Sequence, residues 1–316
     1  MRSLILCTSL CLLLGACAGQ ASAPAPAFPP DTEATSLFGE PLVSAALPPE
    51  VRARRETQLA EAEAAVKAAP GDPDALIWLG RRTAYLGRYR EAIGIFSRGI
   101  QRFPEDARFY RHRGHRYITV RDFDLAIEDL RQASRLIAGK PDEVEPDGLP
   151  NARNIPTSTL QSNIWYHLGL AHTLKGDFDK ALPAYRECLK VSNNPDMLVA
   201  TTYWLYSTLR RLGREEEARQ VLTPIHAGLE IIENEGYHRL LRMIQGELSP
   251  EELRAEASGD LDPPTLGYGI GNWHLYSGRR EEAVKSFREV LAGGNWPAFG
   301  YIAAEAELKR MGEGRR

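Results

Sequence analysis

The most regular stretch of the 316-residue chain is residues 162–195, which read SNIWYHLGLAHTLKGDFDKALPAYRECLKVSNNP. Within it, Gly169 is followed by Ala181 after twelve residues and by Tyr185 after four more. Gly176 lies between the two halves. Small residues let two helices approach closely, large apolar residues fill the space beside them, and glycine suits the turn between helices. The stretch therefore predicts two amphipathic helices joined by a short turn.

The same spacing recurs in four other parts of the chain. The matching positions begin at Gly80, Gly114, Tyr206 and Gly271, and we expect units near residues 73–106, 107–140, 162–195, 199–232 and 264–297. A turn glycine recurs in every unit except the second, where Arg121 stands. One pair of amphipathic helices cannot bury its own apolar face, so successive pairs must stack. The spacing predicts an all-α fold, a right-handed superhelical solenoid of helix-turn-helix units with flanking capping helices.

The third unit resembles the tetratricopeptide repeat (TPR). It keeps the family's Trp, Leu-Gly, Ala and aromatic positions at Trp165, Leu168, Gly169, Ala181 and Tyr185. Departures occur elsewhere, because Arg113 stands where leucine is expected and the fourth and fifth units lack the tryptophan. The resemblance implies a scaffold that binds proteins and no enzyme, cofactor or metal.

The remaining segments complete a solenoid that we expect over residues 50–312. Residues 50–69 follow two prolines and predict a helix that covers the first unit. Residues 236–257 predict a divergent helical pair, and residues 298–311 predict a C-terminal capping helix with an apolar stripe. Residues 139–159 are a proline-rich insertion between the second and third units.

The N-terminal residues 1–16 have the features of a secretory signal peptide. An apolar run of about 11 residues follows Arg2, and this is shorter than the ~20 residues of a membrane-spanning helix. Leu14-Gly15-Ala16-Cys17 resembles the bacterial lipobox, which implies cleavage before Cys17 and lipidation of its thiol. By resemblance to lipoprotein sorting in enteric bacteria, Ala18 implies the outer membrane. Residues 17–49 are rich in proline and alanine and predict a tether.

Composition and charge limit the kinds of partner. The chain is 43% hydrophobic and 26% charged, which is ordinary for a globular protein and excludes a multi-span membrane protein. Its 39 basic and 42 acidic residues give a formal net charge of −3. This balance provides no electrostatic basis for nucleic-acid binding. Envelope proteins or peptides are the expected partners, and the oligomeric state is left open.

A partner-binding groove is the first candidate site. By resemblance to the repeat family, the inner positions of the first three units are held by Arg81, Tyr85, Arg108, Arg111, His115 and Tyr166. Residues 107–121 contain five arginines and no acidic residue, and guanidinium groups suit carboxylates. The pattern indicates a groove for an acidic peptide or an anionic wall polymer. The alternative is a solvated face whose arginines pair with Glu91, Glu105, Glu128 and Asp129.

The insertion at residues 139–159 is the second candidate. Loops of this length are usually functional or disordered, and in solenoids they cluster on a binding face. The candidate partner contacts are Asp142, Glu143, Glu145, Asp147, Asn151, Arg153 and Asn154. The alternative is that the insertion is a passive spacer.

Three further patterns favour structural roles over chemistry. His112 and His115 are spaced as metal ligands can be, but no third ligand follows and the neighbouring arginines repel a cation. Cys188 takes a position usually held by alanine, which favours a small buried thiol over a nucleophile. Gly267, Gly269 and Gly271 favour close helix packing over a phosphate loop, because no strand precedes them.

The whole layout resembles outer-membrane TPR lipoproteins that act as adaptors for peptidoglycan hydrolases. The leading hypothesis is a membrane-anchored periplasmic adaptor that binds envelope proteins through its concave groove. One alternative is a component of an outer-membrane assembly complex, which differs only in its partner. The other is an envelope enzyme or small-molecule receptor whose site uses His112, His115 and the insertion.

Overall fold

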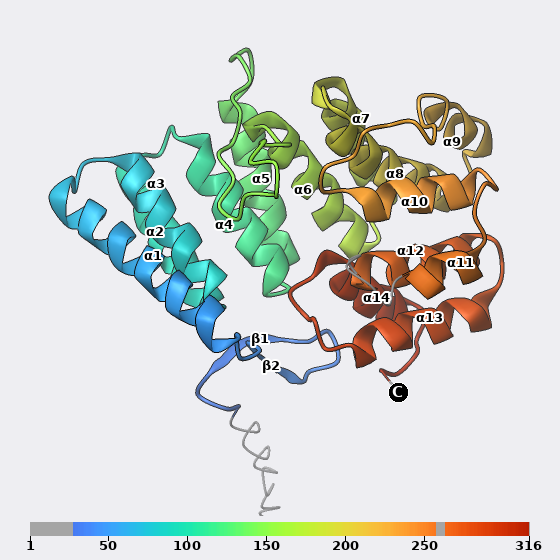
Figure 1. The fold of residues 1–316 in the computed structure, drawn as a ribbon, viewed down its shortest axis with the longest axis horizontal. Helices are drawn as coiled ribbons and strands as arrows, with labels where there is room; N and C mark the ends of the chain where they lie inside the picture. Colours follow the sequence, from blue (N-terminus) through green and yellow to red (C-terminus); the bar gives the residue numbers. More distant parts are fainter. Residues whose placement is uncertain (1–27, 257–262, 316) are drawn as a thin grey trace, which may run out of the picture.

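The computed structural model describes residues 28–256 and 263–315, so the signal peptide and Cys17 lie outside the described residues. The described chain is almost entirely helical, which confirms the prediction of an all-α solenoid. In these residues no helix is both long and apolar enough to cross a membrane. Figure 1 shows the helices side by side in chain order, with the C-terminal helices below the central ones.

Helix α1 (Pro49–Ala68) packs against the first of five helix pairs. The pairs are α2 (Pro73–Tyr85) with α3 (Tyr89–Arg102), α4 (Ala107–Thr119) with α5 (Phe123–Leu136), α6 (Leu160–Lys175) with α7 (Phe178–Val191), α8 (Pro195–Arg211) with α9 (Glu215–Val221), and α12 (Pro263–Tyr276) with α13 (Arg280–Ala292). Between the last two pairs lie α10 (Glu235–Ile244) and α11 (Pro250–Glu256), and α14 (Phe299–Arg310) follows them all.

Polar residues at the helix starts explain where the pairs begin. Asp72 and Asp106 each accept a hydrogen bond from the main-chain N–H two residues later, at 2.9 and 3.0 Å. Asn194 accepts one from Met197 N at 3.0 Å, which starts α8 at Pro195, four residues before the unit expected from residue 199. These side chains satisfy N–H groups that have no partner inside the helix.

The repeated glycines mark the close approach of the two helices in a pair. A Cβ atom at Gly169 would lie 2.6 Å from the Tyr185 ring, and one at Gly271 would lie 2.6 Å from the Phe287 ring. Neither distance is possible between real atoms, so only glycine lets the large side chain cross at this point. The spacing of sixteen residues from glycine to large side chain is therefore the signature of the helix crossing.

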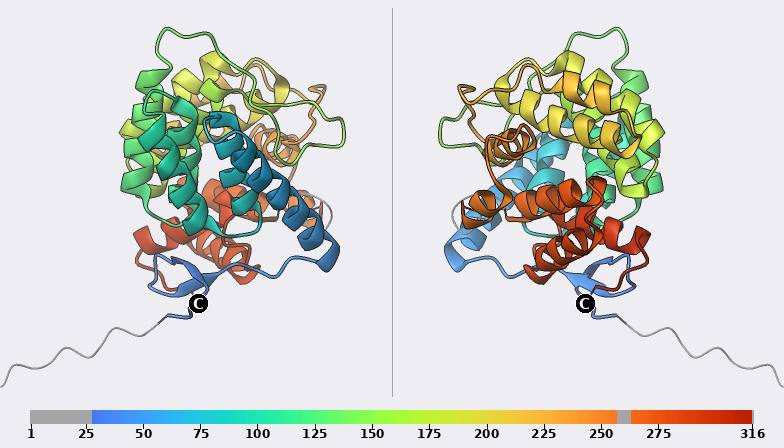
Figure 2. Two further views of the ribbon diagram at one scale, coloured as in Figure 1. Left: turned by 90° about the vertical axis from the view of Figure 1, so that its left-hand side faces the viewer. Right: turned by 90° about the vertical axis from the view of Figure 1, so that its right-hand side faces the viewer.

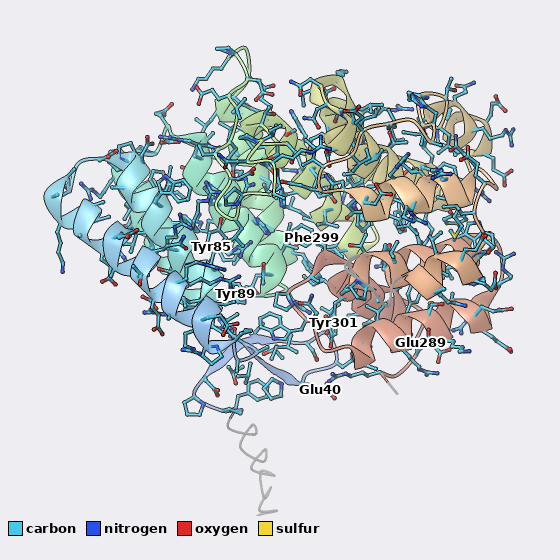
Figure 3. All side chains as sticks on the ribbon, viewed as in Figure 1. Glu40, Tyr85, Tyr89, Glu289, Phe299 and Tyr301 are labelled. Carbon is cyan, nitrogen blue, oxygen red and sulfur yellow. The ribbon has the colours of Figure 1, made fainter. Side chains whose placement is uncertain are left out.

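The C-terminal helices turn back onto the array and do not extend it. Helix α12 packs against α8 and α10, and α14 packs against α6 as well as against α12 and α13. Phe299, labelled in Figure 3, lies at the start of α14. Its ring is 5.2 Å from that of His115 in α4 and 5.5 Å from that of His167 in α6. The inner face of the array, meaning the face of α2, α4, α6 and α8 turned away from their partner helices, is thus covered over α6 and α8 by the chain itself.

The structure corrects the tether predicted over residues 17–49. Strands β1 (Thr32–Thr35) and β2 (Pro41–Val43) form an antiparallel hairpin whose Ala34 and Leu42 are buried. The Trp296 indole donates a hydrogen bond to Val43 O at 2.7 Å, and Ser44 Oγ donates to Gly87 O at 2.6 Å. Proline content suggested an extended segment, but these long-range contacts fix residues 32–44 on the body. Figure 2 shows the hairpin beside the C terminus.

Arg121 explains why the second unit lacks its turn glycine. Its φ is +72°, a backbone conformation that glycine adopts far more easily than arginine. Its guanidinium is buried and lies 2.8 Å from a carboxylate oxygen of Glu305 in α14, and it donates to Trp296 O at 3.0 Å. The other Glu305 oxygen accepts from Leu37 N in the hairpin at 2.8 Å. One buried ion pair therefore joins the second pair, the hairpin and the C-terminal helix.

Candidate functional site

Helix α4 carries the arginine-rich sequence and lies between α2 and α6. Phe109 and Ile118 are fully buried and fix one face of α4 against its neighbours. Arg111, Arg116 and His115 extend from another face toward α2 and the insertion, where they line a common cavity. The apolar positions of α4 thus orient its arginines toward the inner face.

Arg108 lies at the rim of this site and is held by acidic neighbours. Its guanidinium is 2.6 Å from an oxygen of Asp106 and 2.5 Å from an oxygen of Asp74. The hydrogen bonds that Arg108 donates to Asp106 and Asp74 raise the pKa of its guanidinium above the usual range. Arg113 points elsewhere and makes two 2.7 Å contacts with the buried Asp129. For these two side chains the predicted alternative of a paired face describes the structure better than an open groove.

Arg111 is buried, which corrects its assignment to an open groove. Its Nε lies 3.0 Å from an oxygen of Glu145, which belongs to the insertion. Asn163 of α6 donates to the same Glu145 oxygen at 3.1 Å. Burial lowers the pKa of Arg111, and the Glu145 charge opposes this shift. The insertion therefore supplies the counter-ion of the basic helix.

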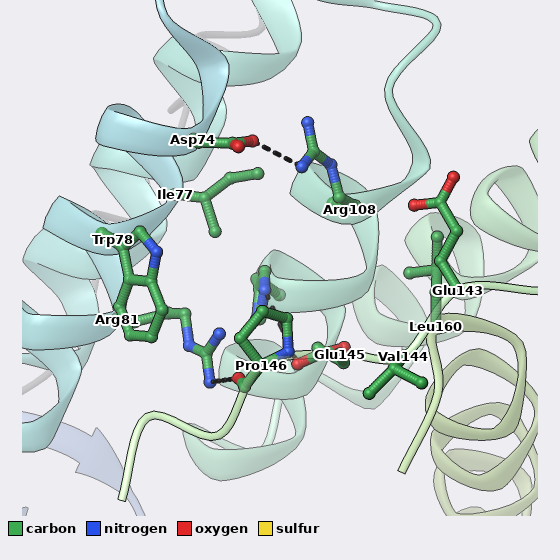
Figure 4. Close-up of a pocket in the computed structure, with 11 residues that line it drawn as sticks. Asp74, Ile77, Trp78, Arg81, Arg108, Glu143, Val144, Glu145, Pro146 and Leu160 are labelled. Atoms are coloured by element: carbon green, nitrogen blue, oxygen red, sulfur yellow. Dashed lines mark hydrogen bonds and ion pairs between the residues drawn. The ribbon is translucent and has the colours of Figure 1, made fainter. Parts of the chain in front are cut away.

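Two arginines of α2 hold the main chain of the insertion. Arg81 Nη2 donates to Pro146 O at 2.8 Å, and Arg82 Nη1 donates to Gly148 O at 2.9 Å. Figure 4 shows the first of these bonds between Arg81 and Pro146. Tyr85, one turn further along α2, accepts from Arg81 Nε at 3.3 Å. The insertion thus lies across α2 and α4.

Beneath the insertion is a cavity of about 110 Å³ with an excess of positive charge. Its lining includes Arg81, Arg111 and Arg116 but only one carboxylate, that of Glu145. Burial lowers the pKa of Arg116 to about 10, so this side chain stays charged at pH 7. Burial also lowers the pKa values of His112 and His115 well below their usual range, so both are neutral at pH 7.

A second, larger pocket of about 230 Å³ lies between α2, α4 and the insertion (Figure 4). Trp78 lines it, with the guanidinium carbons of Arg81 and Arg82 at 4.4 and 4.8 Å from the indole ring. Val144 of the insertion faces the same pocket and is 65% exposed. The pocket therefore combines an aromatic ring, guanidinium groups and an exposed apolar side chain.

His115 and Tyr166, both assigned to the open groove, lie near α14 and α10 respectively. The His115 ring is 4.5 Å from that of His167 and tilted by 38° to it. The Tyr166 hydroxyl is 3.0 Å from that of Tyr237 and accepts a 2.7 Å bond from the Trp204 indole. The assignment of Tyr166 is wrong for a partner that binds the folded chain, because α10 covers this position, whereas His115 is only partly covered and lines the cavity with Arg111 and Arg116.

The other candidate residues of the insertion mainly shape the loop. Asp142 Oδ1 accepts from Glu143 N and Gln161 N, and Asn151 Oδ1 accepts from Arg153 N at 3.0 Å. Asn151 Nδ2 also donates to Glu233 at 2.5 Å, which attaches the insertion to the segment before α10. The Glu143 and Arg153 side chains are exposed, Asn154 has a φ of +52°, and burial raises the pKa of Asp147.

Sequence comparisons agree with the helix pairs described above. Tetratricopeptide repeat models match residues 80–141 and residues 162–195. The chain contains tetratricopeptide repeats over these residues. Its helix pairs α2/α3, α4/α5 and α6/α7 contain these TPR matches. No curated protein sequence matches the chain.

Solved structures resemble the chain only distantly. A crystal structure of YrrB, titled a TPR protein with an unusual peptide-binding site, is 14% identical, with a TM-score of 0.42 over 78% of this chain and 97% of that one. A crystal structure of MamA is 16% identical, with a TM-score of 0.42 over 65% of this chain and all of the other. At these sequence identities and TM-scores, the likeness says nothing about what this chain binds.

Trp78, Arg82 and Arg116 are the site residues that sequence reasoning missed. The indole of Trp78 and the guanidinium of Arg82 are four residues apart on α2, the spacing at which side chains meet on a helix, and this signal could have identified them. The sequence places Arg116 in the basic helix, but only the structure shows that no carboxylate of residues 28–256 or 263–315 forms an ion pair with it.

The features weighed for other chemistry have structural partners. Among the described residues there is no group of three or more His, Cys, Asp or Glu side chains that could hold a metal ion. Cys188 is buried, as predicted, and burial raises its pKa to about 11. Gly269 and Gly271 lie inside α12 against Leu240 and Phe287, so they serve helix packing and form no phosphate loop.

Proposed function

We propose that this TPR protein is a non-enzymatic adaptor, held by a lipid on Cys17 at the periplasmic side of an outer membrane, that binds an envelope protein. The anchor rests on the lipobox-like residues Leu14 to Cys17. The adaptor role rests on the TPR fold and on the surface around the pocket that Trp78 lines. A lipid anchor of this kind would raise the local concentration of a bound partner at the membrane to roughly millimolar.

The observation that carries the binding role is the composition of the pocket between α2, α4 and the insertion. Trp78 is held between Arg81 and Arg82, and its ring lines the opening. Tryptophan and arginine are the side chains that most often dominate the binding energy of protein interfaces. A partner side chain that enters this pocket would contact an aromatic face and fixed guanidinium groups together.

The insertion adds exposed apolar surface to the same side. Val144, Leu149 and Ile155 are 65%, 52% and 48% exposed, and they are three of the six large exposed apolar side chains in the described residues. Apolar side chains grouped on one loop favour contact with another protein. We therefore assign the partner surface to the pocket and the insertion together.

The test is crosslinking in intact cells followed by purification of the full-length, lipidated protein. We compare the wild type with Trp78→Ala combined with Val144→Ser. The matched control is Leu125→Ser, which removes an apolar side chain that is 44% exposed on α5. We expect the double variant to lose most of the captured partner and the control to retain it. Equal capture by all three proteins would contradict the assigned surface.

Two further measurements separate this proposal from its alternatives. Cys17→Ser is expected to move the protein from the membrane fraction to the soluble fraction, and no change in fractionation would contradict the anchor. Metal analysis of the purified protein tests the enzyme alternative, because stoichiometric zinc would overturn the adaptor role. The identity of the captured partner distinguishes an adaptor for a single envelope protein from a component of an assembly complex.

A further inference from the structure

Residues 143–148 of the insertion lie extended between α4 and the start of α6. Their own loop holds them on one side, where Glu145 N donates to Ser158 O at 3.1 Å and Leu160 N donates to Glu143 O at 2.8 Å. Val144 and Thr159 form an antiparallel bridge. The bridge gives Val144 the pairing of a strand residue, and the chain bends at Gly148.

On the other side, α2 grips the main chain of this segment. The bonds from Arg81 to Pro146 O and from Arg82 to Gly148 O both end on main-chain carbonyl groups. Every peptide carries such carbonyls, so these two contacts recognise an extended main chain and not this particular sequence. Specificity must come from the side chains at the remaining contacts.

Two positions of the segment are specific. The Glu145 carboxylate lies 3.0 Å from Arg111 Nε and 3.8 Å from His112 Nε2. At Gly148 there is no room for a side chain, because a Cβ atom would overlap the Tyr85 hydroxyl. The site therefore selects an acid at one position and a glycine three residues later.

The insertion leaves the positive charge of the site only partly neutralised. Three guanidinium groups line the cavity, and in the described part of the chain no carboxylate lies within 4.0 Å of the Arg81 or Arg116 guanidinium. A buried charge is unfavourable unless it is paired. A segment that brings a second carboxylate would therefore bind this site more strongly than residues 143–148 do.

We propose that residues 143–148 are an internal ligand of the site between α2 and α4, and that the partner binds by displacing them with an extended segment that places one carboxylate at Arg111 and a second within reach of Arg81 or Arg116. This inference rests on the proposed function, because it specifies how the partner enters. In the free protein, residues 143–148 then occupy the site and keep weakly binding or uncharged ligands out of it. The insertion is released as a flexible arm when the acidic segment takes its place.

The test uses a fluorescent peptide with the sequence of residues 142–149, DEVEPDGL, added to the full chain. The main variant is Gly148→Val, whose side chain cannot fit beside Tyr85 and so expels the internal segment. Its control is Gly71→Val, an exposed loop position with nothing within 4 Å of an added Cβ. We expect Gly148→Val to bind the peptide at least about tenfold more tightly than the wild type and the control, a difference of about 1.4 kcal/mol.

A second pair of variants keeps the test decisive if Gly148→Val does not fold. Glu145→Gln removes the carboxylate that faces Arg111, and Glu143→Gln removes an exposed carboxylate two residues away. We expect only Glu145→Gln to bind the peptide more tightly than the wild type. Hydrogen exchange of residues 143–148 in the wild type should become faster when the peptide is added.

The peptide itself provides the remaining controls. Replacing its second glutamate, which corresponds to Glu145, by glutamine should weaken binding by at least about fivefold, and a scrambled peptide of equal charge should not bind. Equal binding to all variants, or equal binding of the scrambled peptide, would overturn the internal-ligand proposal. If the peptide fails while the Trp78-dependent partner capture persists, the adaptor function stands and only this inference is lost.

Discussion

The inner face of the repeat array is filled in two different ways. Over α6 and α8 it is covered by the helices α10, α12 and α14, and the side chains there are mainly aromatic, such as Trp204, which stacks at 5.5 Å on Tyr268. Over α2 and α4 it is covered by a single loop segment, which is held by an ion pair and by bonds to its main chain.

The difference shows which part of the inner face can serve a partner. Aromatic packing between helices buries large apolar areas and is lost only with unfolding. The contacts of a loop with charged side chains are fewer, and another carboxylate can replace each of them. The first half of the array is therefore an exchangeable site, whereas the second half is core.

The strongest way to break this comparison is to truncate one tryptophan in each half. Trp204 is 1% exposed and is packed on three aromatic rings, so Trp204→Ala should lower the free energy of unfolding by about 3–5 kcal/mol. Trp78→Ala should cost only about 1 kcal/mol, because its ring is partly exposed between two guanidinium groups. Denaturant titration measures both values. Equal losses would show that the first half is also core.

The buried ion pair tests whether the C-terminal helices are an integral part of the fold. Glu305→Gln leaves Arg121 buried without its counter-ion and should destabilise the protein by about 3 kcal/mol. Thermal unfolding measures the effect. Glu56→Gln is the control, because Glu56 pairs with Arg52 on the exposed surface of α1 and its loss should leave the unfolding transition unchanged. A small effect of Glu305→Gln would mean that the packing of α14 and the hairpin on the repeat array contributes little to the free energy of unfolding.

Acid should weaken the protein through its buried histidines, of which His112 and His115 lie on α4 and His167 and His172 on α6. Burial lowers the pKa of His167 to about 3 and that of His172 to about 4, against an ordinary histidine pKa of 6.5. The unfolded chain therefore binds protons that the folded chain refuses, and the unfolding free energy falls as the pH drops from about 6.5 toward 4.

Denaturant titrations at pH 7, 6 and 5 measure this slope, which is at most about 1.4 kcal/mol per pH unit for each histidine. His167→Gln should remove one such contribution below pH 6.5. His226→Gln, at an exposed position, should leave the slope unchanged. An unchanged slope in His167→Gln would contradict the assignment of acid sensitivity to this residue.

The smallest expected effect concerns the ion pair by which Glu145 of the insertion contacts Arg111 of α4. Glu145→Gln should loosen residues 143–148 by about 1 kcal/mol and speed their hydrogen exchange, while the thermal unfolding of the helices stays nearly constant. A loss of global stability comparable to that of Trp204→Ala would instead place the insertion in the core.

The helix pairs were predictable because their signal is local. The crossing of Gly169 over Tyr185 involves residues sixteen apart, and the same spacing is repeated along the chain. The hairpin was not predictable in this way, since Ala34 and Leu42 are buried by elements near the other end of the chain. Proline content alone suggested a tether there.

The candidate site was only partly predictable for the same reason. The basic character of α4 and the acidic character of the insertion are visible in the sequence, and Arg81, Arg111 and Glu145 do lie together. The ion pair between Arg111 and Glu145 depends on where the insertion docks. The substitution of Arg121 for a turn glycine was the one local sign of a distant contact, because its partner lies 184 residues away.

The hairpin also determines how force and distance act on an anchored molecule. Only 10 residues lie between Cys17 and Phe28, where the described chain begins, so the proposed lipid on Cys17 would hold that point within about 40 Å of the bilayer even if the intervening chain were fully extended. A pull on such an anchor would reach the hairpin before α1. Trp296 and Ser44 join the hairpin to the C-terminal helices and to the first repeat, so both would receive the load.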